Sequence, residues 1–182
     1  MIYKGKGKWI GLSAVLTVVI ILVSVLPSES SPLPGIEVVT VTHVVDGDTL
    51  DVVSSNGQSR TVRLIGVDTP ESVHPDATRN TNEGIEASEY TKSLVAVGQE
   101  VYLTSDVSDV DRYGRLLRYV WLSQPSEDPS EDEASSIMLN AQLVSDGYAQ
   151  PKRYPPDTAW AELLERLGAS ALDAGLGISD KF

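Results

Sequence analysis

Three short runs rich in β-branched residues follow one another early in the chain, and they constrain its fold more than any other feature. The runs are Ile36 to Val45, Thr49 to Val53 and Arg60 to Val67, and apolar residues recur in each at nearly every second position. Asn56-Gly57, a residue pair that tolerates the positive φ angles of a tight hairpin turn, separates the second run from the third. The sequence therefore predicts a three-stranded meander.

The rest of the domain is predicted to add two strands and about three helices. In chain order we expect a helix over Asn82 to Val97, strands over Glu100 to Leu103 and Leu116 to Leu122, and helices over Ser136 to Ser145 and Thr158 to Ala174. Gly98 is a natural stop for the first helix, and Asp157-Thr158 is a natural cap for the last. This order predicts an α+β domain, a small five-stranded barrel with helices packed outside it.

An acidic, proline-bearing stretch at 123–135 interrupts the predicted elements. Its five carboxylates lack the Asp-x-Asp-x-Asp-Gly order of an EF-hand loop. Because the stretch has almost nothing to bury, we expect an exposed, mobile loop.

The first 30 residues have the order of an export segment. Three lysines precede an uncharged apolar run, Trp9 to Leu26, and a linker at 31–36 separates this segment from the domain at 37–180. The run has 18 residues, which is long for a signal peptide and short for a bilayer span, and no convincing small-x-small cleavage site follows. A cleaved signal and an uncleaved membrane anchor both remain open. The flanking lysines and the linker disfavour a buried core helix, and either export hypothesis places the domain outside the cytoplasm.

Cysteine content and charge limit the possible chemistry. The chain has no cysteine, which excludes disulfides, thiolate zinc sites and cysteine nucleophiles. Its net charge is -12, and residues 31–182, with 11 basic and 25 acidic side chains, carry about -14. Such acidity opposes tight electrostatic binding to nucleic acid, unless a divalent cation and a few local arginines supply the attraction. A metal would need oxygen ligands or the two histidines, and His43 and His74 are better explained as surface and loop residues.

Three polar segments could carry chemistry, but each is ambiguous alone. Asp46-Gly47-Asp48-Thr49 offers two carboxylates to a hard cation, although Asp-Gly is also an ordinary turn. Asp68-Thr69-Pro70-Glu71 ends a strand with two more carboxylates, and it also resembles a turn or a helix start. Asp111 to Arg115 supplies two arginines and a tyrosine, as a polar hairpin tip would.

Taken together and in this order, the three segments resemble the staphylococcal nuclease, or thermonuclease, family. The resemblance covers about Val38 to Ala174, nearly the whole domain. Further matching residues are Arg63-Leu64, His74-Pro75, Glu86-Ala87-Ser88, and the late group Asn140, Leu143, Val144, Gly147 and Ala149. The resemblance implies an OB-fold barrel and a calcium-dependent nuclease that cuts DNA and RNA and leaves 3′-phosphate ends. It indicates no protein partner, and we expect a monomer.

The resemblance also implies a calcium site. Asp48 and Asp68 would be direct ligands, with the main-chain carbonyl of Thr69 as a third and water completing the shell. Asp46 would lie behind these ligands without touching the metal. Calcium accepts loose oxygen cages of this kind, into which a substrate phosphate can enter.

The same resemblance implies catalytic and substrate-binding residues. Arg63 and Arg115 would grip the phosphate from two sides, because the forked guanidinium group can bond two oxygens at once. Glu71 would hold the attacking water. Tyr113 and Tyr154 would bind the nucleotide, where an aromatic ring can stack on a base.

Two other hypotheses from the sequence remain to be weighed. The domain could be a nucleic-acid-binding module that has lost its catalytic groups, because fold does not fix function. The presence of all five predicted ligands and catalytic residues argues against that. It could instead be an external structural or calcium-binding domain with a partner on its acidic loop, but the sequence offers no partner motif.

Overall fold

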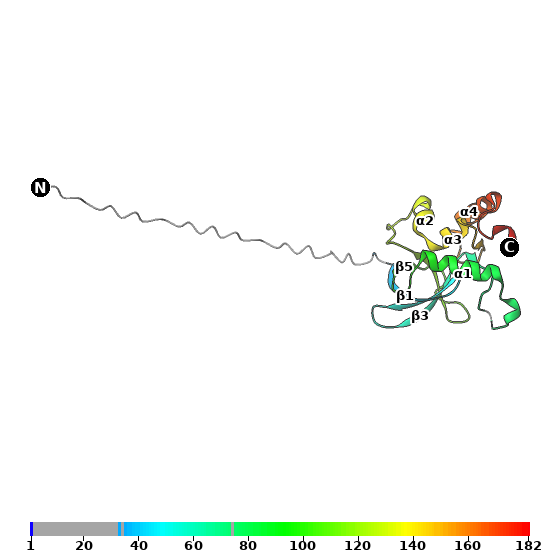
Figure 1. Cartoon of the computed structure of the whole chain (residues 1–182), viewed down its shortest axis with the longest axis horizontal. Helices are drawn as coiled ribbons and strands as arrows, with labels where there is room; N and C mark the ends of the chain where they lie inside the picture. The colour runs from blue at the N-terminus through cyan, green and yellow to red at the C-terminus, as the bar shows by residue number, and fades with distance from the viewer. Residues whose placement is uncertain (2–32, 34, 74) are drawn as a thin grey trace. The chain divides into compact units, whose positions relative to one another are not determined.

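The computed structural model describes Met1, Leu33, residues 35–73 and residues 75–182 (Figure 1). The predicted export segment and His74 therefore lie outside the described residues. Within the described ranges, no helix has the length and apolar character needed to cross a bilayer.

Five strands close into a barrel, as the sequence predicted. They are β1 (Glu37–Asp46), β2 (Thr49–Ser54), β3 (Ser59–Leu64), β5 (Glu100–Thr104) and β6 (Leu116–Trp121). Their order around the barrel is β1-β2-β3-β6-β5, and β5 pairs with β1 to close it. All neighbours are antiparallel except β3 and β6, which run parallel. This is the five-stranded Greek-key arrangement of an OB-fold.

The barrel core comes from the β-branched alternation that the sequence shows. Val39 and Val41 on β1, Leu50 and Val52 on β2, and Val62 on β3 are all buried, while polar residues lie between them. The expected β2–β3 hairpin is confirmed: Gly57 has a φ of 83°, and the Asn56 carboxamide accepts bonds from Ser54 and Gln58.

The third predicted strand is interrupted, and the interruption positions part of the site. β3 ends at Leu64, and Gly66, with a φ of 79°, turns the chain before the short strand β4 (Val67–Asp68). β4 pairs with β7 (Gln150–Pro151), a strand that the sequence did not predict. Buried Asn140 holds the turn by donating to the Ile65 carbonyl at 2.8 Å.

Four α-helices cover the barrel where about three were predicted. They are α1 (Asn82–Leu94), α2 (Glu131–Ile137), α3 (Leu139–Ser145) and α4 (Ala161–Ala174), with short 3-10 turns at Ala77–Arg79 and Ser179–Lys181. Helices α2, α3 and α4 gather on one side of the barrel, and α1 packs along β1 (Figure 1). The side chain of Thr81 caps α1, and Gly175 ends α4 in the left-handed conformation.

Three predictions, one of a loop and two of helices, need correction. The acidic stretch at 123–135 is not all loop, because Glu131, Asp132 and Glu133 form the first turn of α2 behind the Ser130 cap. Acidic residues suit a helix N-terminus, where the helix dipole is positive.

The predicted helix over Ser136 to Ser145 also breaks at Met138, so that it contributes to both α2 and α3. Asp157 does not cap α4, which begins at Ala161. Its carboxylate instead accepts the backbone N–H groups of Val107 and Ser108, at 3.0 and 2.7 Å, and so ties two loops together.

Candidate active site

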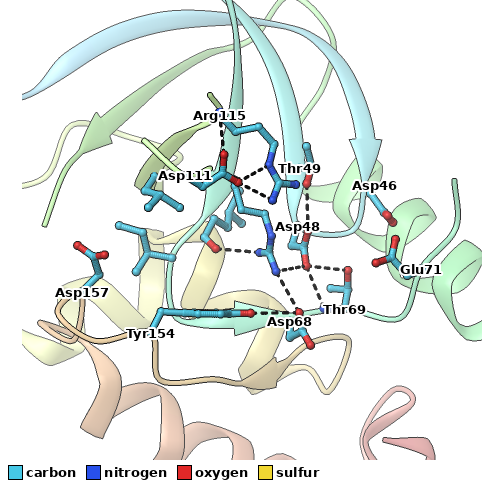
Figure 2. Close-up of a pocket in the computed structure, with 14 residues that line it drawn as sticks. Asp46, Asp48, Thr49, Asp68, Thr69, Glu71, Asp111, Arg115, Tyr154 and Asp157 are labelled. Atoms are coloured by element: carbon cyan, nitrogen blue, oxygen red, sulfur yellow. Dashed lines mark hydrogen bonds and ion pairs between the residues drawn. The ribbon is translucent and has the colours of Figure 1, made fainter. Parts of the chain in front are cut away.

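A cavity of about 340 Å³ opens where β2, β3 and β4 meet the loop before β6. Its lining is mostly polar, and Figure 2 shows Asp46 and Glu71 at one end and Asp157 and Tyr154 at the other. The lining residues are Asp46, Asp48, Thr49, Arg63, Leu64, Ile65, Asp68, Thr69, Glu71, Asp111, Arg115, Leu117, Tyr154 and Asp157.

The turn between β1 and β2 presents two aspartates to the cavity. The Asp46 Oδ1 atom accepts the Gly47 N–H and the Ser72 hydroxyl, each at 2.8 Å. Gly47 is required for the turn to approach Thr69, because a Cβ atom there would lie 2.8 Å from the Thr69 Oγ1 atom. From α1, the Thr91 hydroxyl donates to the Gly47 carbonyl at 2.7 Å. The turn is therefore held from two sides.

Asp48 is buried at the centre of the site. Its Oδ2 atom accepts the N–H and the hydroxyl of Thr69, at 3.0 and 3.1 Å, and lies 3.0 Å from the Arg63 Nη2 atom. Burial raises the pKa of the Asp48 carboxyl, and the nearby Asp46 charge adds to this, while Arg63 and the Thr69 N–H oppose it. A positive charge in the cavity would favour the ionised form of Asp48.

Arg63 joins the two predicted metal ligands. Its Nη2 atom lies 3.0 Å from Asp48 and 3.1 Å from the Oδ1 atom of Asp68. Its Nη1 atom donates to the carbonyls of Leu64 and Val67, at 2.9 and 3.0 Å, which holds the guanidinium in place. Both carboxylates therefore contact the same guanidinium nitrogen of Arg63.

Asp68 has a second cationic neighbour that sequence reasoning missed. The Lys152 Nζ atom lies 2.8 Å from the Asp68 Oδ2 atom, and the Tyr154 hydroxyl donates to Oδ1 at 3.4 Å. This contact raises the pKa of the Lys152 ammonium. The backbone N–H of Lys152 also donates to the Gly66 carbonyl at 2.9 Å, extending the β4–β7 pairing.

Glu71 stands at the rim and is fixed through its main chain. Its carbonyl accepts the Thr81 N–H at 2.9 Å, just before α1, and its carboxylate lies 3.8 Å from Arg79. Gly84 permits this close approach, because a Cβ atom at that position would lie 2.2 Å from the Glu71 carbonyl oxygen. The first turn of α1 therefore positions the residue predicted to hold the water.

Arg115 is held by a tight turn that begins at Asp111. The Asp111 Oδ2 atom bonds the Arg115 Nε and Nη2 atoms, both at 2.7 Å, while Oδ1 accepts the N–H groups of Tyr113 and Arg115 at 2.9 and 3.0 Å. Burial works to raise the pKa of Asp111, but these N–H groups and the guanidinium outweigh it and lower the pKa. The two-bond contact fixes the plane of the guanidinium.

The structure brings most of the predicted site residues together. Asp46, Asp48, Arg63, Asp68, Thr69, Glu71, Arg115 and Tyr154 all line the cavity. Tyr113 does not line it; this exposed residue borders a neighbouring groove that shares Arg115 with the cavity.

The sequence assigned no role in the site to three residues that lie there. Asp111 was noted only as the first residue of the arginine segment, Asp157 was assigned to a helix cap, and Lys152 carried no signal.

The charge of the cavity suits an oxygen-bound cation. Its lining contains six carboxylates and two arginines, an excess of negative charge. Within the part of the chain that the structure describes, no three Asp, Glu or His side chains form a ready-made metal cage. Asp48 and Asp68 nevertheless lie close together, since both contact the same Arg63 nitrogen, and calcium accepts two carboxylates with carbonyl oxygens and water as further ligands. The residues present therefore fit calcium.

Comparison with known proteins agrees with this geometry. A family model described as staphylococcal nuclease homologue matches residues 61–179. A thermonuclease of Staphylococcus hyicus is 35% identical over 163 residues, which are 86% of this chain and 88% of the relative. A thermonuclease of Staphylococcus intermedius is 39% identical over 141 residues, 78% of this chain and 75% of the relative. Endonuclease YncB of Bacillus subtilis is 42% identical over 89 residues, 48% of this chain and 41% of the relative.

The barrel topology and the cavity define an enzyme built on an OB-fold, with carboxylates and arginines facing one another in its site. The chain belongs to the staphylococcal nuclease family, and it is a nuclease.

Proposed function

We propose that this protein hydrolyses phosphodiester bonds of DNA and RNA with Ca²⁺ as its cofactor, and that it leaves 3′-phosphate ends. The observation that carries this proposal is that Asp48 and Asp68 lie close enough to contact the same Arg63 nitrogen, inside a cavity that also holds Arg115 and Glu71. The thermonucleases and the endonuclease among its relatives support it.

The calcium site consists of Asp48 and Asp68, with the Thr69 carbonyl as the predicted third ligand. Bound calcium supplies a Lewis acid that polarises a phosphate oxygen and offsets the developing charge. Asp46 does not bind the metal itself. Its carboxylate accepts hydrogen bonds from the Gly47 N–H and the Ser72 hydroxyl, and so fixes the turn that carries Asp48.

Arg63 and Arg115 orient and stabilise the phosphate. Each is held before substrate arrives, Arg63 by two carbonyls and two carboxylates and Arg115 by Asp111. Donors that are already in place need no reorganisation as charge builds on the five-coordinate phosphorus, which makes their stabilisation of the transition state effective.

Glu71 positions the water that attacks phosphorus. A bond forms between the water oxygen and phosphorus, the bond from phosphorus to the 5′-oxygen breaks, and the 5′-oxygen leaves with a proton as a hydroxyl. The 3′-phosphate remains on the other fragment. Tyr154 reaches in from the far end of the cavity, with its hydroxyl directed at Asp68, and is suited to contact the nucleotide.

We further propose that the domain acts outside the cytoplasm as a monomer, through the predicted export segment at 1–30. If that segment is not cleaved, it also attaches the protein to the membrane. Separating the membrane, cytoplasmic and external fractions of the producing cells tests export and membrane attachment. Sequencing the N-terminus of the released protein shows whether the segment is cleaved.

The test is cleavage of heat-denatured DNA and of RNA by the purified chain, with calcium and with a chelator. Glu71→Gln should lower the rate by about 10²–10⁴-fold with little loss of binding, whereas Arg63→Ala, which removes a phosphate contact, should lower the rate by a similar factor and also weaken binding. Arg166→Ala, an exposed arginine outside the cavity, is the control. Cleavage that survives the chelator would remove calcium from the mechanism, and binding without cleavage would favour the non-catalytic module.

A further inference from the structure

Thr91 on α1 is a fully buried hydroxyl residue that the predicted site does not account for. Its Oγ1 atom lies 2.7 Å from the Gly47 carbonyl oxygen, although the two residues are 44 positions apart in the sequence. Gly47 belongs to the turn between β1 and β2, beside Asp46 and Asp48. The contact therefore joins a helix to the turn that carries a predicted metal ligand.

The Thr91 hydroxyl has a second acceptor within its own helix. The Ala87 carbonyl, one turn earlier, lies 3.0 Å from it, and a threonine inside a helix often makes this local bond alone. A hydroxyl has one proton to donate, however, and the helical ladder already pairs the Ala87 carbonyl with the Thr91 N–H. Because a buried carbonyl without a donor is costly, the geometry favours the nearer Gly47 carbonyl as the acceptor.

The turn that Thr91 holds also packs against Thr69 at the end of β4. A Cβ atom on Gly47 would lie 2.8 Å from the Thr69 Oγ1 atom, so the two backbones approach closely. The Asp48 Oδ2 atom accepts both the N–H and the hydroxyl of Thr69. Asp48 follows Gly47 in the chain, so a shift of the Gly47 peptide would also move the Asp48 carboxylate away from these donors.

The face of α1 that carries Thr91 also reaches the segment of Glu71. This face consists of small buried residues at the i, i+3, i+4 and i+7 positions of the helix: Gly84, Ala87, Ser88 and Thr91. Gly84 lies against the Glu71 carbonyl, and Thr91 meets the Gly47 carbonyl about 10 Å further along the helix. One rigid face therefore contacts both the segment predicted to hold the water and the turn predicted to hold the metal.

We propose that Thr91 is a positioning residue of the active site. Its hydroxyl holds the Gly47 carbonyl and so keeps Asp48 in place, while α1 sets the distance between this turn and Glu71. Thr91 touches neither the metal nor the substrate and acts only through the turn. The inference rests on the proposed calcium site and deepens it.

The experiment compares Thr91→Val with Thr91→Ser in the full chain. Valine keeps the shape of threonine without its hydroxyl, whereas serine keeps the hydroxyl and loses a methyl group. Calorimetric titration with Ca²⁺, without nucleic acid, should give an affinity about tenfold weaker in Thr91→Val, as is typical when a group that orients a metal ligand is lost. Thr91→Ser should bind calcium as wild type does.

Steady-state cleavage of heat-denatured DNA at saturating calcium provides a second measurement. Thr91→Val should lower kcat by about tenfold and change KM less. The reason is that Asp111 holds Arg115, and the Leu64 and Val67 carbonyls hold Arg63, without help from the turn. Thr91→Ser should again be close to wild type.

A variant that only destabilises the fold separates positioning from folding. Val101→Ala opens a small cavity in the core at β5, outside the active-site cavity. It should lower the melting temperature without changing calcium affinity or kcat. All variants are compared at a temperature at which circular dichroism shows them folded. If Thr91→Val is unfolded there, Thr91→Ala makes the same test with less crowding of the Gly47 carbonyl.

Wild-type calcium affinity and kcat in the variant without the hydroxyl would overturn the positioning role, and so would equal losses in Thr91→Ser. If wild-type protein bound no calcium, the proposed cofactor would be wrong. The kcat values of the same variants, measured with the divalent cation that supports cleavage, would then still decide whether Thr91 positions the site.

Discussion

At the scale of single residues, the most informative contact is the one between Lys152 and Asp68. The ammonium lies 2.8 Å from the Asp68 Oδ2 atom, and Arg63 holds the other oxygen. A calcium ion and an ammonium repel one another, and they would share one carboxylate. Lys152 must therefore move, or weaken its bond, when the proposed metal binds.

Replacing Lys152 tests this competition. Lys152→Met should tighten calcium binding to the free protein about fivefold, because the metal no longer displaces an exposed ion pair worth up to about 1 kcal/mol. Calorimetric titration with Ca²⁺ in the absence of nucleic acid measures the effect. Lys92→Met, which removes an ion-paired lysine on α1 outside the cavity, should change nothing. Unchanged or weaker affinity in Lys152→Met would show that the lysine does not compete.

The resemblance to the family predicted much of the site, and the residues that it missed share a physical reason. Each of the segments that carry Asp48, Asp68 and Glu71 is ambiguous alone, and only their shared order, which matches the family, predicted that they belong to one site. Lys152 reaches Asp68 across 84 residues, through a two-residue strand pair that leaves no periodic trace. Tyr113 was placed with the nucleotide, but a motif cannot show that it borders a separate groove.

At the scale of elements, the first turn of α1 presses against the segment that carries Glu71. Gly84→Ala would place a methyl group 2.2 Å from the Glu71 carbonyl oxygen, so the helix or the segment must shift. We expect a loss of about 1–3 kcal/mol in unfolding free energy, as for other overpacked sites, together with a lower kcat. Thermal unfolding and steady-state kinetics measure both. Ser93→Ala, on the exposed side of the same helix, is the control, and wild-type behaviour of Gly84→Ala would contradict the tight contact.

The turn from Asp111 to Arg115 should make stability depend on acid. Because the pKa of Asp111 is lowered in the folded protein, its ionised form contributes stability above the unfolded value of 3.8, and this contribution is lost as pH falls through the folded value. Asp111→Asn should therefore be less stable than wild type at pH 7, by about 1–3 kcal/mol for lost bonds to a charged group. Urea unfolding at several pH values should show the two proteins converging below about pH 4. A constant difference down to pH 3 would contradict the assignment.

The strands of the barrel were predictable where local chemistry and tertiary pairing agree. Alternation located β1, β2, β5 and β6 to within about a residue, and Asn56-Gly57 located the hairpin. Hydropathy did not locate α2, because its first turn is entirely acidic and depends on the Ser130 cap and the helix dipole. The end of β3 at Leu64 also escaped, since Gly66 and the pairing of β4 with β7 act through contacts distant in sequence.

At the scale of the whole molecule, an acidic domain has to attract an acidic polymer. With net charge near -14 and six carboxylates in its cavity, the domain should gain more from a divalent cation than from any single side chain. The bound metal should then stabilise the fold as well as the reaction.

Calcium at about 100 times its dissociation constant should raise the melting temperature by about 5–10 °C, since binding to the native state alone contributes about 2.7 kcal/mol. Differential scanning calorimetry with calcium and with potassium at equal ionic strength separates binding from screening. The double variant Asp48→Asn with Asp68→Asn should not respond to calcium. An equal response in that variant would place the stabilising ion elsewhere.

The pairing of β4 with β7 also means that an early segment of the site depends on a late one. β7 and Lys152 lie late in the chain, and Pro151 packs against Gly168 of α4 so closely that a Cβ atom on the glycine would meet its ring at 2.7 Å. Asp68 precedes β7 by about 80 residues, so its described surroundings form only once β7 is present in the chain. A chain that ended before β7 would therefore carry the predicted ligands and arginines without Lys152 and without the strand that pairs with β4.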